Sequence, residues 1–221
     1  MSPKVLVSNR ETKLVAYRLS GFAIVLHNLG GTTEEMEIPI YKSSWKSFPE
    51  KLKTKKFSDG FVSKEMCHKR LCHEVAKRVA EEIAFGKIGV TNISAMEVEA
   101  ATNFARVMVL DFGMSEALGN RVILPINLNK ASTETKRLVE KDIAIFMKRA
   151  FEKAHEIIES NKETFEKLAK TLIERRKLGQ DEIKAILEGR ELPKEMLEDG
   201  TKNGKSKSTI FAKLKSLVSK L

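Results

Sequence analysis

Residues 15–26 read VAYRLSGFAIVL, an apolar helical stretch on which the interpretation of the whole chain depends. An arginine, a serine and a glycine interrupt it at Arg18, Ser20 and Gly21, where a core helix would carry further apolar side chains. Nothing in this stretch performs chemistry by itself. The reason for the interruption must therefore come from the rest of the chain.

Composition and hydropathy predict a mainly α-helical protein with a small β-sheet or edge strand. The chain has 221 residues, of which 42% are apolar, 32% charged and 6% aromatic, with five prolines. This composition is typical of amphipathic helices with lysine and glutamate on their outer faces. No apolar run approaches the roughly 20 residues of a membrane-spanning helix. The start, Met1–Lys4, lacks the features of a secretory signal, so we expect a cytoplasmic protein.

The net charge of +10 is unevenly distributed along the chain. Residues 42–56 hold six lysines and one glutamate, and residues 201–221 hold six lysines and no acidic residue. These two segments together exceed the total, so the remainder is about neutral. A diffuse nucleic-acid-binding surface is therefore not predicted.

Hydrophobic periodicity outlines the secondary structure. Apolar residues recur with helical spacing over residues 9–29, 63–85, 95–113, 133–160, 162–176 and 180–188. Ser63 is the expected N-cap of the second helix, and a glycine pair ends the first. Alternation over residues 35–41 predicts a strand, which Pro39 confines to a sheet edge. Residues 120–128 are expected to form a short extended connector.

The last residues, 201–221, form a separate basic tail. Its apolar side chains follow the spacing of one helix face, in the set Ile210, Phe211, Leu214, Leu217, Val218 and Leu221. Lys213, Lys215 and Lys220 lie off that stripe, so the pattern predicts a basic amphipathic helix behind a flexible hinge. Such a helix can pack on its own domain or on a neighbouring subunit, or it can contact a membrane surface or a partner. We expect these residues to serve interaction.

Cysteines and histidines cluster on the helix expected at residues 63–85. Cys67 and Cys72 lie five residues apart, about 140° around a helix axis, so no disulfide can join them and both are expected as reduced thiols. Only His68 and Cys72, four residues apart, share a helix face. One interpretation is a core or half-buried role for these side chains. The alternative is a two-ligand metal half-site, completed by another subunit or by His27.

Longer segments share their order and spacing with one protein family. They read RVAEEIAFGKIGVTN over residues 78–92, AMEVEAATNFARVMVLDFGMSEALG over 95–119 and TKRLVEKDIAIFMKRAFEKAHEII over 135–158. These segments resemble the peptidase domain of FtsH, the membrane-anchored AAA protease. KLAKTLIERRKLGQDEIKAIL, over residues 167–187, resembles the end of that domain. The resemblance spans residues 11–188 and implies a helical zinc-metallopeptidase fold.

In that family the first helix carries the zinc motif HExxH, normally within VAYHEAGHA. Two histidines four residues apart lie on one helix face and bind zinc, and the glutamate beside the first activates the metal-bound water as general base. A third ligand, an aspartate within NDLxxAT, comes from a later helix. The resemblance thus assigns chemistry to three positions of the opening stretch and to one position of the later helix.

The opening stretch keeps the frame of this motif and none of its chemical groups. Arg18 stands at the first histidine, Leu19 at the glutamate and Phe22 at the second histidine. Glu97 stands at the aspartate and alone keeps an oxygen. A cationic arginine at this place repels a metal ion, and phenylalanine has no atom that can coordinate one. No general base remains at position 19. We therefore expect no catalytic residue and no bound zinc. An ion pair between Arg18 and Glu97 is predicted in place of the metal.

The resemblance also suggests a domain organisation. Residues 1–130 are expected to form a peptidase-like core with the degenerate zinc helix and the small β region, and residues 131–200 a C-terminal helical subdomain, followed by the tail. The chain shows no GxxxxGK[ST] stretch, so no ATP site is expected. A membrane anchor and a motor are likewise not recognised, and we expect a stand-alone domain.

The expected function is that of an inactive pseudopeptidase acting by protein–protein interaction or oligomeric assembly. Its partner would be a second copy or an active FtsH-type protease, in a hexameric ring of the kind the family forms, with no specific nucleic acid. One alternative is a metal-dependent hydrolase, related to ATP-dependent metallopeptidases, with a relocated site on the cysteine and histidine helix. Another is a membrane-surface adaptor that uses the tail. The strand at 35–41 could still accept an extended peptide, as the family's edge strand does.

Overall fold

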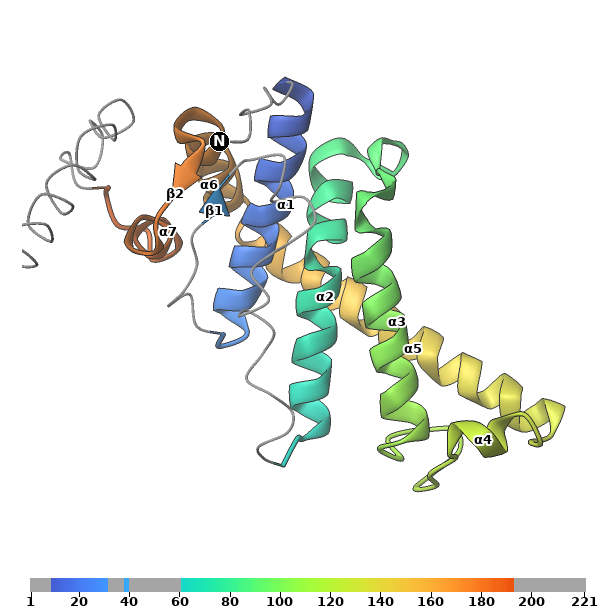
Figure 1. Ribbon diagram of the computed structural model, residues 1–221. Helices are drawn as coiled ribbons and strands as arrows, with labels where there is room; N and C mark the ends of the chain where they lie inside the picture. The colour runs from blue at the N-terminus through green and yellow to red at the C-terminus, as the bar shows by residue number, and fades with distance from the viewer. Residues whose placement is uncertain (1–8, 32–37, 40–60, 193–221) are drawn as a thin grey trace, which may run out of the picture.

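The computed structural model describes residues 9–31, 38–39 and 61–192 (Figure 1). Its helices are α1 (Asn9–Asn28), α2 (Lys64–Phe85), α3 (Ala95–Leu110), α4 (Pro125–Leu128), α5 (Thr133–Ser160), α6 (Lys162–Arg175) and α7 (Gln180–Leu187). Two 3₁₀ turns, η3 (Lys87–Gly89) and η4 (Asn92–Ser94), join α2 to α3. The predicted mainly α-helical fold class is confirmed.

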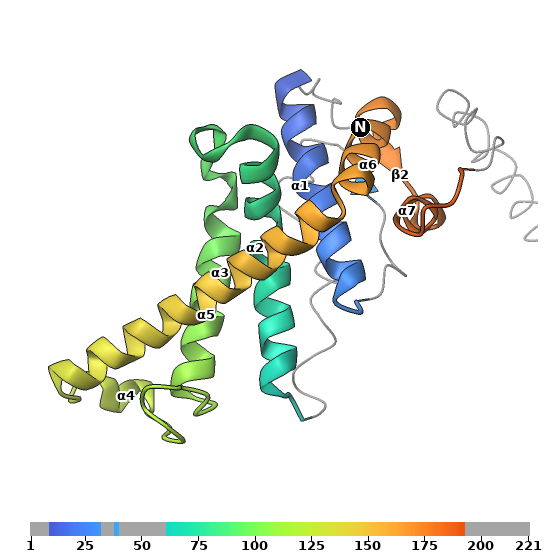
Figure 2. The same ribbon diagram turned by 180° about the vertical axis from the view of Figure 1, so that it is seen from behind.

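The longer helices form a layer crossed by one long helix. Figures 1 and 2 show α1, α2 and α3 side by side, with α5 running across them on one face. Helix α2 packs on α1, whereas α3 packs on α2 and α5. Helix α6 packs on α1, and α7 packs on α6. Helix α2 is therefore the central element, and its two sides face α1 and α3.

Local capping signals begin and end these helices where the sequence indicates. The Ser63 side chain accepts a hydrogen bond from the backbone N–H of Met66 at 3.1 Å, as an N-cap does. Gly86 ends α2 with φ 74°, a conformation that a residue with a Cβ rarely adopts. The long helix α5 likewise begins after Ser132, which caps the N–H of Thr135. The predicted bounds of α2 and α5 are confirmed.

A short antiparallel sheet joins two segments that are far apart in the sequence. Strand β1 (Ile38–Pro39) is the described part of the strand predicted at 35–41, and it pairs with β2 (Lys177–Leu178). Strand β2 was not among the elements predicted from the sequence. Each strand has two residues, so the pairing carries little periodicity to detect. The sheet brings the chain after α6 back to the segment that follows α1.

Two predicted boundaries are wrong. Helix α3 ends at Leu110 instead of Gly113, and Gly113 adopts φ 63° in the turn that follows. The connector predicted as extended over residues 120–128 is helical in its second half, where α4 begins at Pro125. Proline suits the first turn of a helix, since its missing N–H has no partner to lose there.

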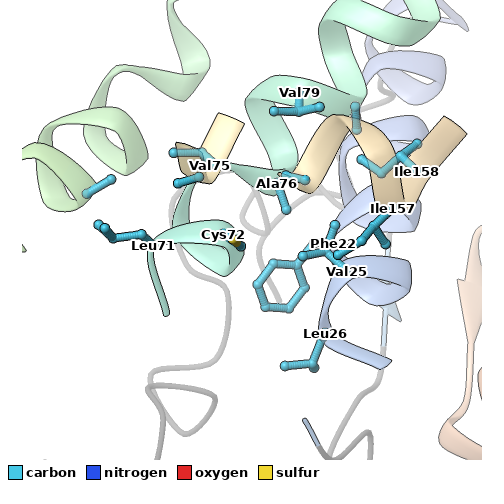
Figure 3. Packing of buried hydrophobic residues seen from close by; sticks show 14 of the residues in the cluster. Phe22, Val25, Leu26, Leu71, Cys72, Val75, Ala76, Val79, Ile157 and Ile158 are labelled. Carbon is cyan, nitrogen blue, oxygen red and sulfur yellow. The ribbon is translucent and has the colours of Figure 1, made fainter. Parts of the chain in front are cut away.

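The hydrophobic core is continuous from α1 to α7. Figure 3 shows its centre, where α1 contributes Phe22, Val25 and Leu26, α2 contributes Leu71, Cys72, Val75, Ala76 and Val79, and α5 contributes Ile157 and Ile158. A Cβ on Gly21 would lie 2.3 Å from the Ala80 Cβ and 3.1 Å from the Ile158 Cδ1. The glycine of the opening stretch is therefore needed because α1 and α2 pack too closely there for a side chain.

Several predicted features lie outside the described residues. They are the lysine-rich segment 42–56, most of the strand at 35–41 and the basic tail at 201–221. The division into residues 1–130, 131–200 and 201–221 stays a prediction. Within the part of the chain that the structure describes, no helix is both long and apolar enough to cross a membrane.

Candidate functional site

Arg18 is buried where α1, α2 and α3 meet. Only 4% of the residue is exposed. Its Nη2 lies 3.0 Å from Glu97 Oε1 on α3, and its Nη1 lies 3.0 Å from Glu81 Oε2 on α2. The Arg18–Glu97 ion pair predicted from the sequence is therefore confirmed, and the same guanidinium also binds a second carboxylate. Charge-assisted hydrogen bonds from one side chain link three helices.

The second carboxylate, Glu81, is fully buried and fully hydrogen-bonded. Its Oε2 also accepts from the Ser94 hydroxyl at 3.0 Å, and its Oε1 accepts from the backbone N–H of Thr91 at 2.6 Å. The Ser94 hydroxyl contacts Arg18 Nη1 as well. A buried carboxylate is costly unless it is paired and its oxygens are satisfied, and both conditions hold here. The turn η4 is thereby bound to α2.

Lys77 supplies a second cation from α2. Its Nζ lies 3.2 Å from Glu97 Oε1, the oxygen that also binds Arg18, and 5.6 Å from the centre of the Phe22 ring. Burial lowers the pKa of Lys77, and the charge of Glu97 opposes that effect. Arg18 and Lys77 thus face the carboxylates of Glu81 and Glu97, and the four charges sum to zero. The zinc-motif positions on α1 and α3 include neither Lys77 nor Glu81.

Phe22 stands at the position of the second histidine, and its ring packs against another aromatic ring. Its ring meets the ring of His73 edge to face, with centroids 6.5 Å apart. Both ring nitrogens of His73 are buried and have no hydrogen-bond partner among the described residues, and burial lowers the pKa of His73 to about 4. The face of α2 that carries His73 is turned toward α1.

One face of α2 therefore supplies the site with His73, Lys77 and Glu81. These residues are spaced by four, and a spacing of four places side chains on one helix face. The row lies beside an otherwise apolar pattern that includes Val75, Ala76 and Val79. This row of polar residues is the sequence signal by which Lys77 and Glu81 could have been found.

The residues at the zinc positions do not fit a metal ion. Leu19, at the position of the general base, packs in the hydrophobic core. Arg18 brings a positive charge, Phe22 offers no donor atom, and Glu97 Oε1 is shared by two cations. Glu97 Oε2 is buried and without a hydrogen-bond partner in the described part of the chain. The arrangement links α1, α2 and α3 through charge-assisted hydrogen bonds.

The cysteine and histidine cluster of α2 packs as core. Cys67 and Cys72 are buried free thiols, and burial raises the pKa of both, that of Cys72 to about 11. The His68 ring packs edge-on against Phe146 with centroids 5.2 Å apart, and burial is the main cause of its lowered pKa. His27 is exposed at the end of α1. These contacts favour the core interpretation, and the half-site with His68 and Cys72 stays a prediction.

No group of three or more histidine, cysteine, aspartate or glutamate side chains is placed to hold a metal ion within residues 9–31, 38–39 and 61–192. A helical domain with the frame of HExxH on its first helix and an acidic residue at the third-ligand position of a later helix defines a class. It is the class of zinc-metallopeptidase-like domains, here with altered site residues.

The chain matches the family model described as peptidase family M41 over residues 5–186, and it therefore belongs to peptidase family M41. It is 28% identical over 205 residues to ATP-dependent zinc metalloprotease FtsH 1 of Thermoanaerobacter sp. (strain X514). The aligned region covers 85% of this chain and 32% of the relative. FtsH of Slackia heliotrinireducens is 32% identical over 201 residues, covering 83% of this chain and 25% of the relative.

Mouse ATP-dependent zinc metalloprotease YME1L1 is 36% identical over 115 residues, covering 52% of this chain and 16% of the relative. The chain thus spans about a third or less of the length of these curated relatives. The resemblance to FtsH stated from the sequence is confirmed at the level of the family.

Proposed function

We propose that this chain is a pseudopeptidase of family M41, in which the zinc centre has become an ion-pair network and the domain acts by protein–protein interaction or oligomeric assembly. The observation that carries the proposal is the position of the Arg18 guanidinium. It lies 3.0 Å from both Glu81 and Glu97, at the place where the family motif has its first zinc ligand.

The chemistry of peptide hydrolysis supports this proposal. A metallopeptidase polarises a water molecule with its metal and removes the proton with a neighbouring base. The base position holds Leu19, which is 5% exposed and packed in the core, and the two ligand positions hold Arg18 and Phe22. Neither a Lewis acid site nor a base is then available at this place on α1, so we propose that no zinc is resident there.

The proposed partner is a second copy of the chain or an active M41 peptidase, in a ring of six, in the cytoplasm. The relatives are ATP-dependent enzymes by name, whereas the matched part here is the peptidase-like portion. A domain of this fold without hydrolysis retains a surface through which it can join or regulate an active assembly. We propose α5 as the interface side, with the tail and the edge strand at 35–41 as further contacts.

The direct test measures metal and proteolysis on the purified full chain. Zinc content is determined by elemental analysis, and casein cleavage is followed with and without a chelator, beside an active FtsH as positive control. We expect substoichiometric zinc and no cleavage above buffer. Stoichiometric zinc with chelator-sensitive cleavage would refute the proposal.

Variants identify the source of any cleavage that appears. Cleavage that is unchanged by Arg18→Ala but lost in His68→Gln and Cys72→Ser would instead support a relocated site on α2. The interaction part is tested by light scattering of the full chain and by asking whether an active M41 peptidase of the native organism co-purifies with it. A monomer that captures no such peptidase would refute the proposed assembly.

A further inference from the structure

Lys77 lies outside the zinc motif and still reaches the centre of the altered site. It comes from α2, whereas the motif positions lie on α1, and its side chain is 15% exposed. Its Nζ lies 3.2 Å from Glu97 Oε1, and Arg18 Nη2 lies 3.0 Å from the same oxygen. One oxygen of the carboxylate at the third-ligand position, Glu97 Oε1, is therefore bound by two cations from two helices.

The charges around this oxygen balance in pairs. The fully buried carboxylate of Glu81 and the partly buried carboxylate of Glu97, whose side chain is 19% exposed, need about two positive charges to be neutralised, because uncompensated charge in a protein interior is costly. Arg18 supplies one and Lys77 the other. The negative charge of Glu74, one turn before Lys77, also favours the charged form of Lys77. Glu74 itself pairs with Arg70 at 3.9 Å. The centre is neutral without a metal ion.

We propose that Arg18 and Lys77 together replace a divalent metal ion at this junction, and that Lys77 is a second barrier to metal binding, independent of the motif on α1. Two single charges, each tethered to its own helix, do what one doubly charged ion would do. They neutralise the carboxylates of Glu81 and Glu97 and join α1, α2 and α3. The Phe22 ring, 5.6 Å from Lys77 Nζ, covers that cation from the side of α1.

Because Lys77 binds Glu97 from α2, changes on α1 alone would not restore a zinc site. Returning α1 to HExxH requires Arg18→His, Leu19→Glu and Phe22→His. These changes remove one cation and leave Lys77 on Glu97. A bound zinc ion would then compete with an ammonium group for the same carboxylate and would be repelled by it. Restoring the motif alone is therefore insufficient, and Lys77 must also lose its charge.

The experiment compares zinc affinity in matched variants of the full chain. The triple variant R18H/L19E/F22H is compared with the same variant carrying Lys77→Met, by competition with a zinc-binding dye and by elemental analysis after dialysis. The control adds Lys69→Met to the triple variant. Lys69 lies on the same helix, about 12 Å away along its axis, with its side chain 42% exposed, and it pairs with Glu65. This control changes the net charge equally.

We expect Lys77→Met to strengthen zinc binding by the triple variant by at least about tenfold, and Lys69→Met to change it less than about threefold. Equal affinity with and without Lys77 would overturn the proposal. An equal gain from Lys69→Met would also overturn it, because the effect would then be one of net charge. The inference rests on the proposed function, in which the zinc site is lost. Zinc-dependent proteolysis by the unaltered chain would refute the proposed function, whereas the zinc affinities of these variants test the role of Lys77.

A second measurement uses the unaltered site, so that misfolding of the multiple variants leaves the proposal testable. Lys77→Met, Glu97→Gln and their combination form a double-mutant cycle for unfolding by urea. We expect a coupling of at least about fivefold in the unfolding equilibrium, with Lys77→Arg retaining most of the stability. We also expect the unfolding temperature of the unaltered chain to be insensitive to chelator. Absence of coupling, or a lower unfolding temperature in chelator, would overturn the proposal.

Discussion

Replacing Arg18 by methionine tests how much the buried ion-pair network contributes to stability. Methionine keeps much of the buried volume and removes the guanidinium from Glu81 and Glu97, both of which it binds at 3.0 Å. Removing one partner of a buried pair typically costs about 3–5 kcal/mol, because the remaining charge is left uncompensated. Glu81 keeps the N–H of Thr91 and the hydroxyl of Ser94, which offset part of this cost. We expect a loss of about 3 kcal/mol.

The assay is urea unfolding at neutral pH, followed by circular dichroism, with the slope of free energy against urea compared between variants. The matched control is Arg106→Met. Arg106 pairs with Glu140 at 3.1 Å, nearly the same distance, but the two side chains are 39% and 63% exposed. Solvent screening limits such a pair to about 1 kcal/mol or less. The double variant R18M/E81M should recover most of the lost stability, since no buried charge is then left without its partner. Equal losses for Arg18→Met and Arg106→Met would refute this reasoning.

Three further predictions concern the same helices. Gly21→Ala places a Cβ 2.3 Å from that of Ala80 and should lower the free energy of unfolding by about 1–3 kcal/mol. Adding Ala80→Gly should recover most of this loss, because it removes the Cβ that clashes. Thermal unfolding of the two variants measures both effects. The pKa of His73 is lowered from 6.5 to about 4 in the folded chain, so the unfolded chain binds more protons between these values. Stability should therefore be fully present above pH 6.5 and fall by up to about 3 kcal/mol as the pH drops toward 4, and an unchanged pH profile in His73→Phe would contradict this. Cys67 and Cys72 should react with an aromatic disulfide reagent only after unfolding, since both are buried and the pKa of each is raised, and prompt labelling of the native chain would show the α2 packing to be wrong.

Most helix positions could be predicted because their signals are local. The Ser63 cap and the apolar periodicity that follows it locate α2, and the same kind of signal locates α5. Strand β2 could not be predicted in this way. It exists because Lys177 and Leu178 meet a segment that lies nearly 140 residues earlier in the chain, and no local pattern reports such a pairing.

The groups at the zinc positions can be identified from motif spacing alone, because Val15, Ala16, Tyr17, Gly21 and Ala23 keep the frame of the motif around them. Arg18 and Glu97 could be paired from the sequence, since the family places those two positions around one metal. The roles of Glu81 and Lys77 depend on how the helices pack. Helical periodicity places them on one face of α2 but does not say that this face meets α1 and α3. The physical reason is that burial beside a neighbouring helix, and not helix formation itself, turns two surface-type residues into parts of a charge-balanced site.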